Sequence, residues 1–296
     1  MERDFIYKLT IAAAMAVGAY EVSSSLSNLT EIRASGFNNQ MMVPGAVETQ
    51  IASVAKNADW EALIKENKVA KLAVKSSIQL QFGRNLGSGN LAIINGNIVI
   101  FTAGHALDNS EGENLTINRI GLPNGFGNLD LGRQTNYTYV YNNQEGGDLQ
   151  DFGIVVVTQP EVVNLIEEVT TPDQFLTIND LNFAKLKKGS KIDGLCYPAA
   201  STPMPYPLIG GVTIGESATS SQFIVDGFLT YPKCSGGGLF SANKYTGAVS
   251  MGFPPITPSN MGIPSFMVDD AYITTLNSIG GRAGFENLLQ IALNKR

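Results

Sequence analysis

Residues 233–240 read Lys-Cys-Ser-Gly-Gly-Gly-Leu-Phe, a serine followed by three glycines and then by the start of an apolar stretch. Glycines beside Ser235 leave its hydroxyl uncrowded, and the backbone N–H groups of such a turn can point at an incoming carbonyl oxygen. This arrangement suits acyl transfer. Because a serine hydroxyl is a weak nucleophile at neutral pH, the rest of the chain must supply a base and a group that orients it.

The chain offers one candidate for the base and two for the acid that orients it. His105 is the only histidine in the chain, and it follows the apolar residues 98–101 after a turn of small residues. Asp151 directly precedes the apolar residues 152–157 and could accept the imidazole N–H. Asp148 is the weaker alternative because it does not adjoin that strand. A lone histidine is more often structural than catalytic, so the interpretation depends on all three residues together.

Four short motifs resemble those of the trypsin/chymotrypsin-like serine peptidases, including divergent bacterial members. They are Thr-Ala-Gly-His at 102–105, Asp-Phe-Gly-Ile at 151–154, Ser-Gly-Gly at 235–237 and Val-Ser-Met-Gly at 249–252. The order histidine, aspartate, serine separates this family from subtilisin-like and α/β-hydrolase enzymes. The resemblance covers residues 76–270.

The resemblance implies an all-β fold of two six-stranded antiparallel Greek-key barrels, with an N-terminal helical extension and a C-terminal helix. It also implies a serine endopeptidase that hydrolyses peptide bonds in polypeptide substrates without a cofactor and without a metal. In that mechanism His105 takes the proton from Ser235 and Asp151 holds the imidazole. The backbone N–H groups of Lys233 and Ser235 would receive the oxyanion.

Two residues before the serine depart from the family pattern, because Lys233 and Cys234 stand where the family usually has Gly-Asp. A side chain at position 233 favours a backbone N–H that is misaimed until substrate binds, and one such donor is worth roughly 3 kcal/mol. The alternative function is therefore a catalytically inactive peptidase-like module that binds peptides or proteins. Cys234 as the nucleophile is disfavoured, because the glycine pair follows Ser235.

The substrate pocket follows from alignment on the Ser235 motif. The resemblance places Leu229 at the floor of the pocket for the residue before the scissile bond, and Val249 in its wall. The other substrate-binding candidates lie on the strand that would pair with the substrate backbone: Ser250, Met251 and Gly252. Neither pocket residue is charged, and residues 253–264 contain no Asp or Glu. We therefore expect cleavage after apolar residues rather than after Lys or Arg.

Composition limits the other functions. The 296 residues are 44% hydrophobic, which is enough for two barrels and an extension. A net charge of −6 without a basic block disfavours nucleic-acid binding. Two cysteines and one histidine are too few for the usual four-ligand zinc site. Cys196 and Cys234 form either a disulfide or two free thiols, and the sequence leaves both open because it does not give the distance between them.

The N-terminal region divides into two parts. Residues 1–20 contain an apolar run at 9–19 that is too short to span a bilayer and has the length of a signal-peptide core. We expect cleavage before Tyr20 and a secreted or periplasmic protein; a buried N-terminal helix is the alternative. Residues 21–75 are expected to form a linker and a helical extension, because apolar residues recur at helical spacing between 47 and 71. That extension is either a pro-segment or, as we favour, a packing element.

After residue 76 the hydrophobic period changes to two, which is typical of strands. Asn95-Gly96 between two apolar runs predicts a hairpin whose second strand ends just before His105. The expected units are a first barrel at 76–158, an inter-barrel connection at 159–189, a second barrel at 190–268 and a C-terminal helical segment at 269–296. Within that last segment, 269–276 and 285–293 are predicted as helices. No stable membrane span is expected, and the oligomeric state stays open.

Overall fold

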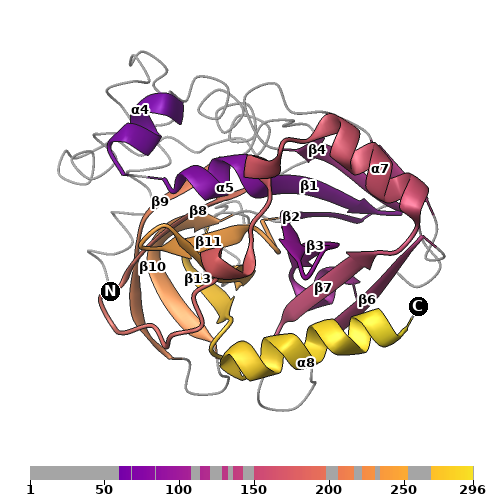
Figure 1. Ribbon diagram of the computed structural model, residues 1–296. Helices are drawn as coiled ribbons and strands as arrows, with labels where there is room; N and C mark the ends of the chain where they lie inside the picture. Colours follow the sequence, from indigo (N-terminus) through magenta and orange to yellow (C-terminus); the bar gives the residue numbers. More distant parts are fainter. Residues whose placement is uncertain are drawn as a thin grey trace, which may run out of the picture.

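The computed structural model describes these residues: 60–67, 69–83, 85–107, 114–120, 129–132, 136–142, 150–197, 206–216, 222–230, 234–252 and 268–295. Within them the chain forms two β-units that lie side by side, with helix α8 (Gly281–Asn294) running along one side of the molecule (Figure 1). The expected signal peptide, the linker that follows it, Asp148 and Lys233 lie outside these residues.

The first β-unit is a seven-stranded antiparallel sheet among the described residues, in the order β5-β4-β1-β2-β3-β7-β6. Its strands are β1 (Ser77–Phe82), β2 (Asn85–Ile94), β3 (Asn97–Thr102), β4 (Leu115–Ile120), β5 (Leu129–Gly132), β6 (Tyr137–Asn142) and β7 (Phe152–Val157). The predicted hairpin is confirmed: Ile94 pairs with Asn97, and both turn residues have positive φ, 52° at Asn95 and 76° at Gly96. Such a turn matches the twist of the strands that it joins.

The second β-unit is a closed barrel in the order β10-β13-β12-β11-β8-β9. Its strands are β8 (Lys191–Cys196), β9 (Tyr206–Glu216), β10 (Phe223–Thr230), β11 (Gly238–Ser241), β12 (Lys244–Gly252) and β13 (Val268–Thr275). The all-β, two-unit architecture that the sequence predicts is confirmed. The first unit differs in detail, because its described strands form a seven-stranded sheet with β5 and β6 at its two ends, where a six-stranded barrel was expected.

Strand β13 corrects one expectation. Residues 269–276 were expected to be helical, but they form most of β13, which pairs with both β10 and β12 and so closes the barrel. The run Tyr272–Thr275 is aromatic and β-branched, which favours a strand, and a segment of only eight residues does not by itself distinguish the helical period from the strand period. The predicted C-terminal helix over 285–293 is confirmed within α8.

Helices occupy the ends and connections of the β-units. They are α4 (Trp60–Lys65), α5 (Lys71–Ser76), α6 (Gly104–Leu107), α7 (Pro160–Val169) and two short 3-10 helices, η2 (Pro172–Gln174) and η3 (Ile178–Asp180). Leu63 of α4 and Val74 of α5 are buried in the largest core cluster. The described part of the N-terminal extension therefore packs on the β-units.

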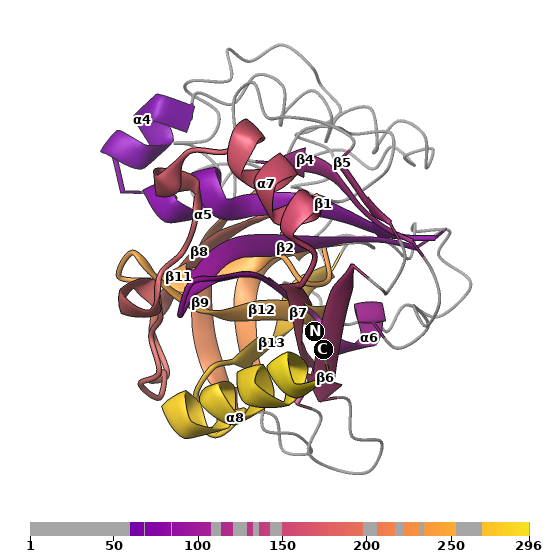
Figure 2. The ribbon, with the colours of Figure 1, turned by 45° about the vertical axis from the view of Figure 1, so that its right-hand side comes forward.

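One of the core clusters spans both β-units. Phe101 on β3 lies against Phe152 of the same sheet, Tyr245 of the second barrel and Phe285 of α8, with ring centroids 5.2 to 5.9 Å apart. Helix α8 packs mainly on β6 and β7 (Figure 2). Because Phe101 is four residues before His105, this aromatic cluster fixes the end of the strand that carries the candidate base.

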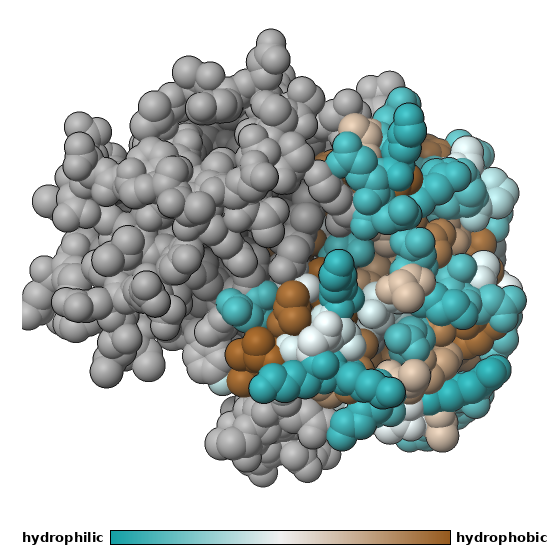
Figure 3. Space-filling view, turned by 90° about the vertical axis from the view of Figure 1, so that its left-hand side faces the viewer, coloured by the Kyte–Doolittle hydropathy of each residue, from teal (hydrophilic) through white to brown (hydrophobic). Residues whose placement is uncertain are grey.

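The described surface is mostly hydrophilic on the face shown in Figure 3, with smaller apolar areas between polar side chains. The large apolar side chains that the described residues expose are these: Leu165, Val212, Ile214 and Ile291. No helix in the described part of the chain is both long enough and apolar enough to cross a membrane.

Candidate active site

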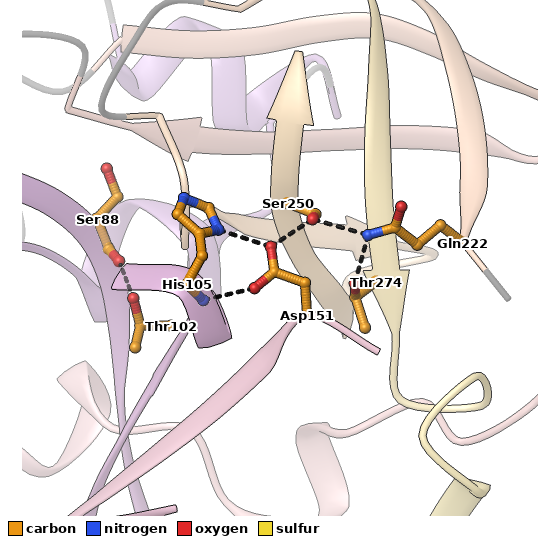
Figure 4. A network of polar contacts seen from close by, with 7 residues as sticks. All are labelled: Ser88, Thr102, His105, Asp151, Gln222, Ser250 and Thr274. Carbon is orange, nitrogen blue, oxygen red and sulfur yellow. Dashed lines mark hydrogen bonds and ion pairs between the residues drawn. The ribbon is translucent and has the colours of Figure 1, made fainter. Parts of the chain in front are cut away.

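His105 lies where the first sheet ends and α6 begins. Its backbone N–H donates to Asp151 Oδ1 at 2.6 Å, and its ring Nδ1 lies 2.7 Å from Asp151 Oδ2 (Figure 4). One carboxylate thus holds both the backbone and the ring of the same histidine. This contact places the proton of the neutral imidazole on Nδ1 and makes Nε2 the basic nitrogen.

The pairing of two strands explains why these residues meet. Strand β3 runs antiparallel to β7, with Thr102 opposite Gly153, so the residues after the end of β3 lie beside those before the start of β7. Gly153 also allows α6 to come close, because a Cβ at this position would lie 2.5 Å from Leu107 Cδ1. The side chain of Asp151 is 3% exposed and that of His105 is 41% exposed. The carboxylate is therefore desolvated while the imidazole faces the surface.

Asp151 has a further partner in the second barrel. The hydroxyl of Ser250, on β12, donates a hydrogen bond to Asp151 Oδ2. Behind it, Gln222 Nε2 donates to Ser250 Oγ at 2.7 Å and to Thr274 Oγ1 at 3.2 Å (Figure 4). Sequence reasoning placed Ser250 on the substrate-binding strand and did not find its side-chain contact with Asp151. Gln222 and Thr274 were missed, since neither belongs to a motif.

The serine turn is held from several sides. Cys196 and Cys234 form a disulfide with their Cα atoms 4.8 Å apart, so of the two alternatives that the sequence left open, the disulfide is the one present. The carbonyl oxygen of Ser235 accepts the N–H of Ser88 at 2.9 Å. In the turn itself, the Gly236 N–H donates to the Val249 carbonyl at 2.8 Å, and the Gly237 N–H donates to Cys234 at 2.8 Å.

Close packing brings this turn to the segment that carries His105. Gly236 has φ 83°, and a Cβ there would collide with the Ser88 carbonyl and the Thr102 hydroxyl and lie 3.0 Å from the Ala103 nitrogen. Thr102 in turn donates to the Ser88 carbonyl at 2.8 Å (Figure 4). The turn after Ser235 is therefore packed against the residues that lead to the candidate base.

A working triad also requires a hydrogen bond from Ser235 Oγ to His105 Nε2. Without substrate, such catalytic hydrogen bonds are often long and tighten only when the substrate binds. The structure thus brings the serine turn, histidine and aspartate into one region, with the bond between His105 and Asp151 formed.

The oxyanion and substrate-binding residues predicted from the sequence lie in the second β-unit or outside the described residues. Lys233, the proposed second oxyanion donor, lies outside the described residues, while Leu229 is on β10. Val249 is 1% exposed within the core of the second barrel, and its N–H donates to the Gly237 carbonyl at 2.9 Å. Met251 and Gly252 end strand β12. The described residues contain no group of three His, Cys, Asp or Glu side chains that could hold a metal ion.

Two β-units with the histidine and aspartate at their junction define the chymotrypsin-like two-barrel fold, the fold of trypsin-like serine peptidases. No family model matches the chain, and no curated protein matches it. The solved structures that resemble it include kallikrein-related peptidase 10, at 13% identity and a TM-score of 0.50, covering 75% of this chain and 98% of that chain.

A mutant of human heparin binding protein is also similar, at 13% identity and a TM-score of 0.50, with 75% of this chain and 95% of that chain covered. The protease Anisep from Arthrobacter nicotinovorans has 16% identity and a TM-score of 0.49, covering 70% of this chain and 92% of that chain. At identities this low the likeness establishes the fold and leaves the activity to the residues of the site.

Proposed function

We propose that the protein is a serine endopeptidase in which Ser235 attacks the peptide carbonyl, His105 takes the serine proton, and Asp151 orients the imidazole. The observation that carries the proposal is the buried Asp151 carboxylate, both of whose oxygens hold His105. A desolvated carboxylate stabilises the imidazolium that forms during proton transfer.

The oxyanion would be received by the backbone N–H groups of Ser235 and Lys233. The disulfide at Cys234 and the hydrogen bonds of Gly236 and Gly237 support this role, since they hold the turn in a defined shape. One donor of this kind contributes roughly 3 kcal/mol to transition-state stabilisation. Whether both N–H groups reach the oxyanion therefore decides the rate of peptide hydrolysis.

The alternative is a peptidase-like binding module without activity, and Lys233 is the residue that favours it. The fold is compatible with both functions, because one similar solved structure is named a peptidase and another a heparin binding protein. Only a measurement on Ser235 separates the two hypotheses.

Labelling with a fluorophosphonate probe makes that measurement. Ser235 Oγ forms a bond to phosphorus, fluoride leaves, and the serine proton passes to His105. We expect labelling of the intact protein and none in Ser235→Ala or His105→Ala. The control Ser241→Ala should be fully labelled, because the Ser241 hydroxyl lies on β11 and donates to the Lys191 carbonyl. Labelling should fall as the pH drops through the pKa of imidazole, about 6.5, because only the neutral ring is a base. Undiminished labelling of His105→Ala would exclude this mechanism.

For the substrate, we propose polypeptides cleaved after Leu, Phe, Tyr or Met. The support is the apolar pair Leu229 and Val249 at the expected pocket, where a Lys or Arg side chain would lose its hydration without a carboxylate partner. Digestion of a peptide library should show these cleavage sites. Predominant cleavage after Lys or Arg would refute the pocket assignment and leave the triad assignment standing.

For localisation, we propose export to an oxidising compartment. The Cys196–Cys234 disulfide supports it, because such bonds persist outside reducing cytosol. Mass spectrometry of the protein from its native host should then find a mature N-terminus at or near Tyr20. An intact Met1 would contradict the proposal.

A further inference from the structure

Gln222 lies behind the residues that hold the candidate base, at the start of β10 in the second barrel. It is 2% exposed, and the residues that accept from its Nε2, Ser250 and Thr274, are fully buried. All three belong to the second β-unit, whereas Asp151, just before β7, and His105, in α6, belong to the first (Figure 4). The contacts therefore form a chain across the junction of the two β-units, from Gln222 through Ser250 and Asp151 to His105.

The amide sets the direction of this chain. The Ser250 hydroxyl has one proton and can either donate it to Asp151 or donate it elsewhere. Gln222 Nε2 donates to Ser250 Oγ at 2.7 Å, so the amide occupies an acceptor position of that oxygen and cannot take its proton at this atom. The hydroxyl proton is left to Asp151 Oδ2. The second N–H of the amide is directed to Thr274 Oγ1 at 3.2 Å, which fixes the orientation of the amide group.

The proton of Ser250 matters because Asp151 Oδ2 is also the oxygen that contacts the imidazole. A donor to that oxygen withdraws negative charge from it, and the carboxylate then stabilises a protonated His105 ring less strongly. The ionisable groups of this network are His105 and Asp151. The orientation of one hydroxyl in the second barrel thus affects the basicity of a ring in the first unit.

We propose that Gln222 is a positioning residue for the candidate triad: it keeps the Ser250 hydroxyl as a donor to Asp151 and thereby sets the basicity of His105. The catalytic meaning of this inference rests on the proposed peptidase function. Its physical content, the coupling of Gln222 to the imidazole, does not depend on that function.

Two substitutions change the coupling in graded ways. Gln222→Met keeps a similar length but removes the donor, so the Ser250 hydroxyl is free to turn away from Asp151. Gln222→Glu replaces the donor with an acceptor, so Ser250 can donate to the new carboxylate. Asp151 then loses the hydrogen bond from Ser250. The second change also adds negative charge near the ring. We expect the pKa of His105 to rise by about half a unit to one unit in Gln222→Met and by more in Gln222→Glu.

Because His105 is the only histidine, the full-length protein labelled with ¹³C and ¹⁵N at histidine gives one imidazole signal to titrate by NMR. The matched controls are Gln290→Met and Gln290→Glu, at an exposed glutamine of α8 that contacts Asn294. These controls should leave the pKa of His105 unchanged. A third variant, Thr274→Val, removes only the second acceptor of the amide and should give a smaller upward change.

A purely structural role for Gln222 predicts lower stability with the same pKa of His105. An unchanged pKa in folded Gln222→Met and Gln222→Glu would overturn the proposal; if neither folds, the titration of Thr274→Val decides in the same way. In the labelling assay, the pH at which labelling falls should shift in each variant by the same amount as the pKa of His105 measured by NMR. Failure of the intact protein to react with the fluorophosphonate would count against the peptidase function alone, since the NMR titration still reads the coupling.

Discussion

Replacing Asp193 by Asn should stabilise the protein at neutral pH and have no such effect near pH 4. Asp193 lies on β8, and its Oδ1 accepts the backbone N–H of Ala70, at the start of α5, at 2.8 Å. Burial raises the pKa of this carboxyl from 3.8 to about 6, and the Ala70 N–H opposes part of that rise. Asparagine offers the same acceptor oxygen without the charge.

The sign follows from proton linkage. Between about pH 4 and 6 the unfolded chain releases the Asp193 proton while the folded protein retains it, so the free energy of unfolding falls as the pH rises through this window. A difference of about two pKa units corresponds to about 3 kcal/mol, and the partial exposure of the group reduces this figure. We expect Asp193→Asn to gain about 1 to 3 kcal/mol at pH 7.5.

Urea denaturation followed by circular dichroism at about pH 4 and 7.5 measures this difference. The control Asp226→Asn removes a charge from an exposed position on β10 and should change stability by less than about 0.5 kcal/mol at either pH. A gain from Asp193→Asn of equal size at both pH values, or a loss at neutral pH, would refute the reasoning. It would mean that the charged form of Asp193 is not penalised where α5 docks on the second barrel.

The disulfide and the glycine turn carry two further predictions. Removing the Cys196–Cys234 bond, which spans 38 residues, should lower the free energy of unfolding by about 4 kcal/mol and reduce probe labelling of Ser235. Equal urea midpoints with and without reductant would contradict the predicted stabilisation by the disulfide. Gly236→Ala should abolish labelling because its Cβ would collide with the backbone, whereas Gly96→Ala, with φ 76° and open space around it, should cost about 1 kcal/mol and keep labelling. Comparable losses of labelling in both variants would indicate that backbone strain alone, and not the packing of the Ser235 turn, is responsible.

Sequence reasoning located the candidate base and acid because both residues lie next to the ends of predictable strands. His105 follows the second strand of an Asn-Gly hairpin, and Asp151 precedes the strand that pairs with it. Both facts depend on local signals: turn residues that require positive φ, and apolar runs of strand length. Local signals thus placed the two strand ends, whereas the contact between the two side chains depends on the pairing of β3 with β7 and was expected from the resemblance to the serine peptidases.

What the sequence did not reveal depends on long-range pairing. Residues 269–276 looked helical because the neighbours that make them a strand, β10 and β12, are distant in the chain. Gln222 carries no local signal, since a glutamine before a strand is most often solvated, whereas this one is buried and donates to Ser250 and Thr274. The disulfide likewise required the Cα distance between Cys196 and Cys234, which composition cannot supply.

The candidate site depends on both β-units at once. Asp151 and His105 belong to the first sheet, but Ser250, which donates to the carboxylate, belongs to the second barrel. The Ser235 turn in the second barrel receives the Ser88 N–H from the first sheet. Separating the units would remove the Ser250 donor from a carboxylate that is 3% exposed, and a hydrogen bond to a charged group contributes about 1.5 to 3 kcal/mol. The core around Phe101, Tyr245 and Phe285 therefore supports the Asp151 site indirectly, because it keeps the two units in contact and so keeps the Ser250 donor beside the carboxylate.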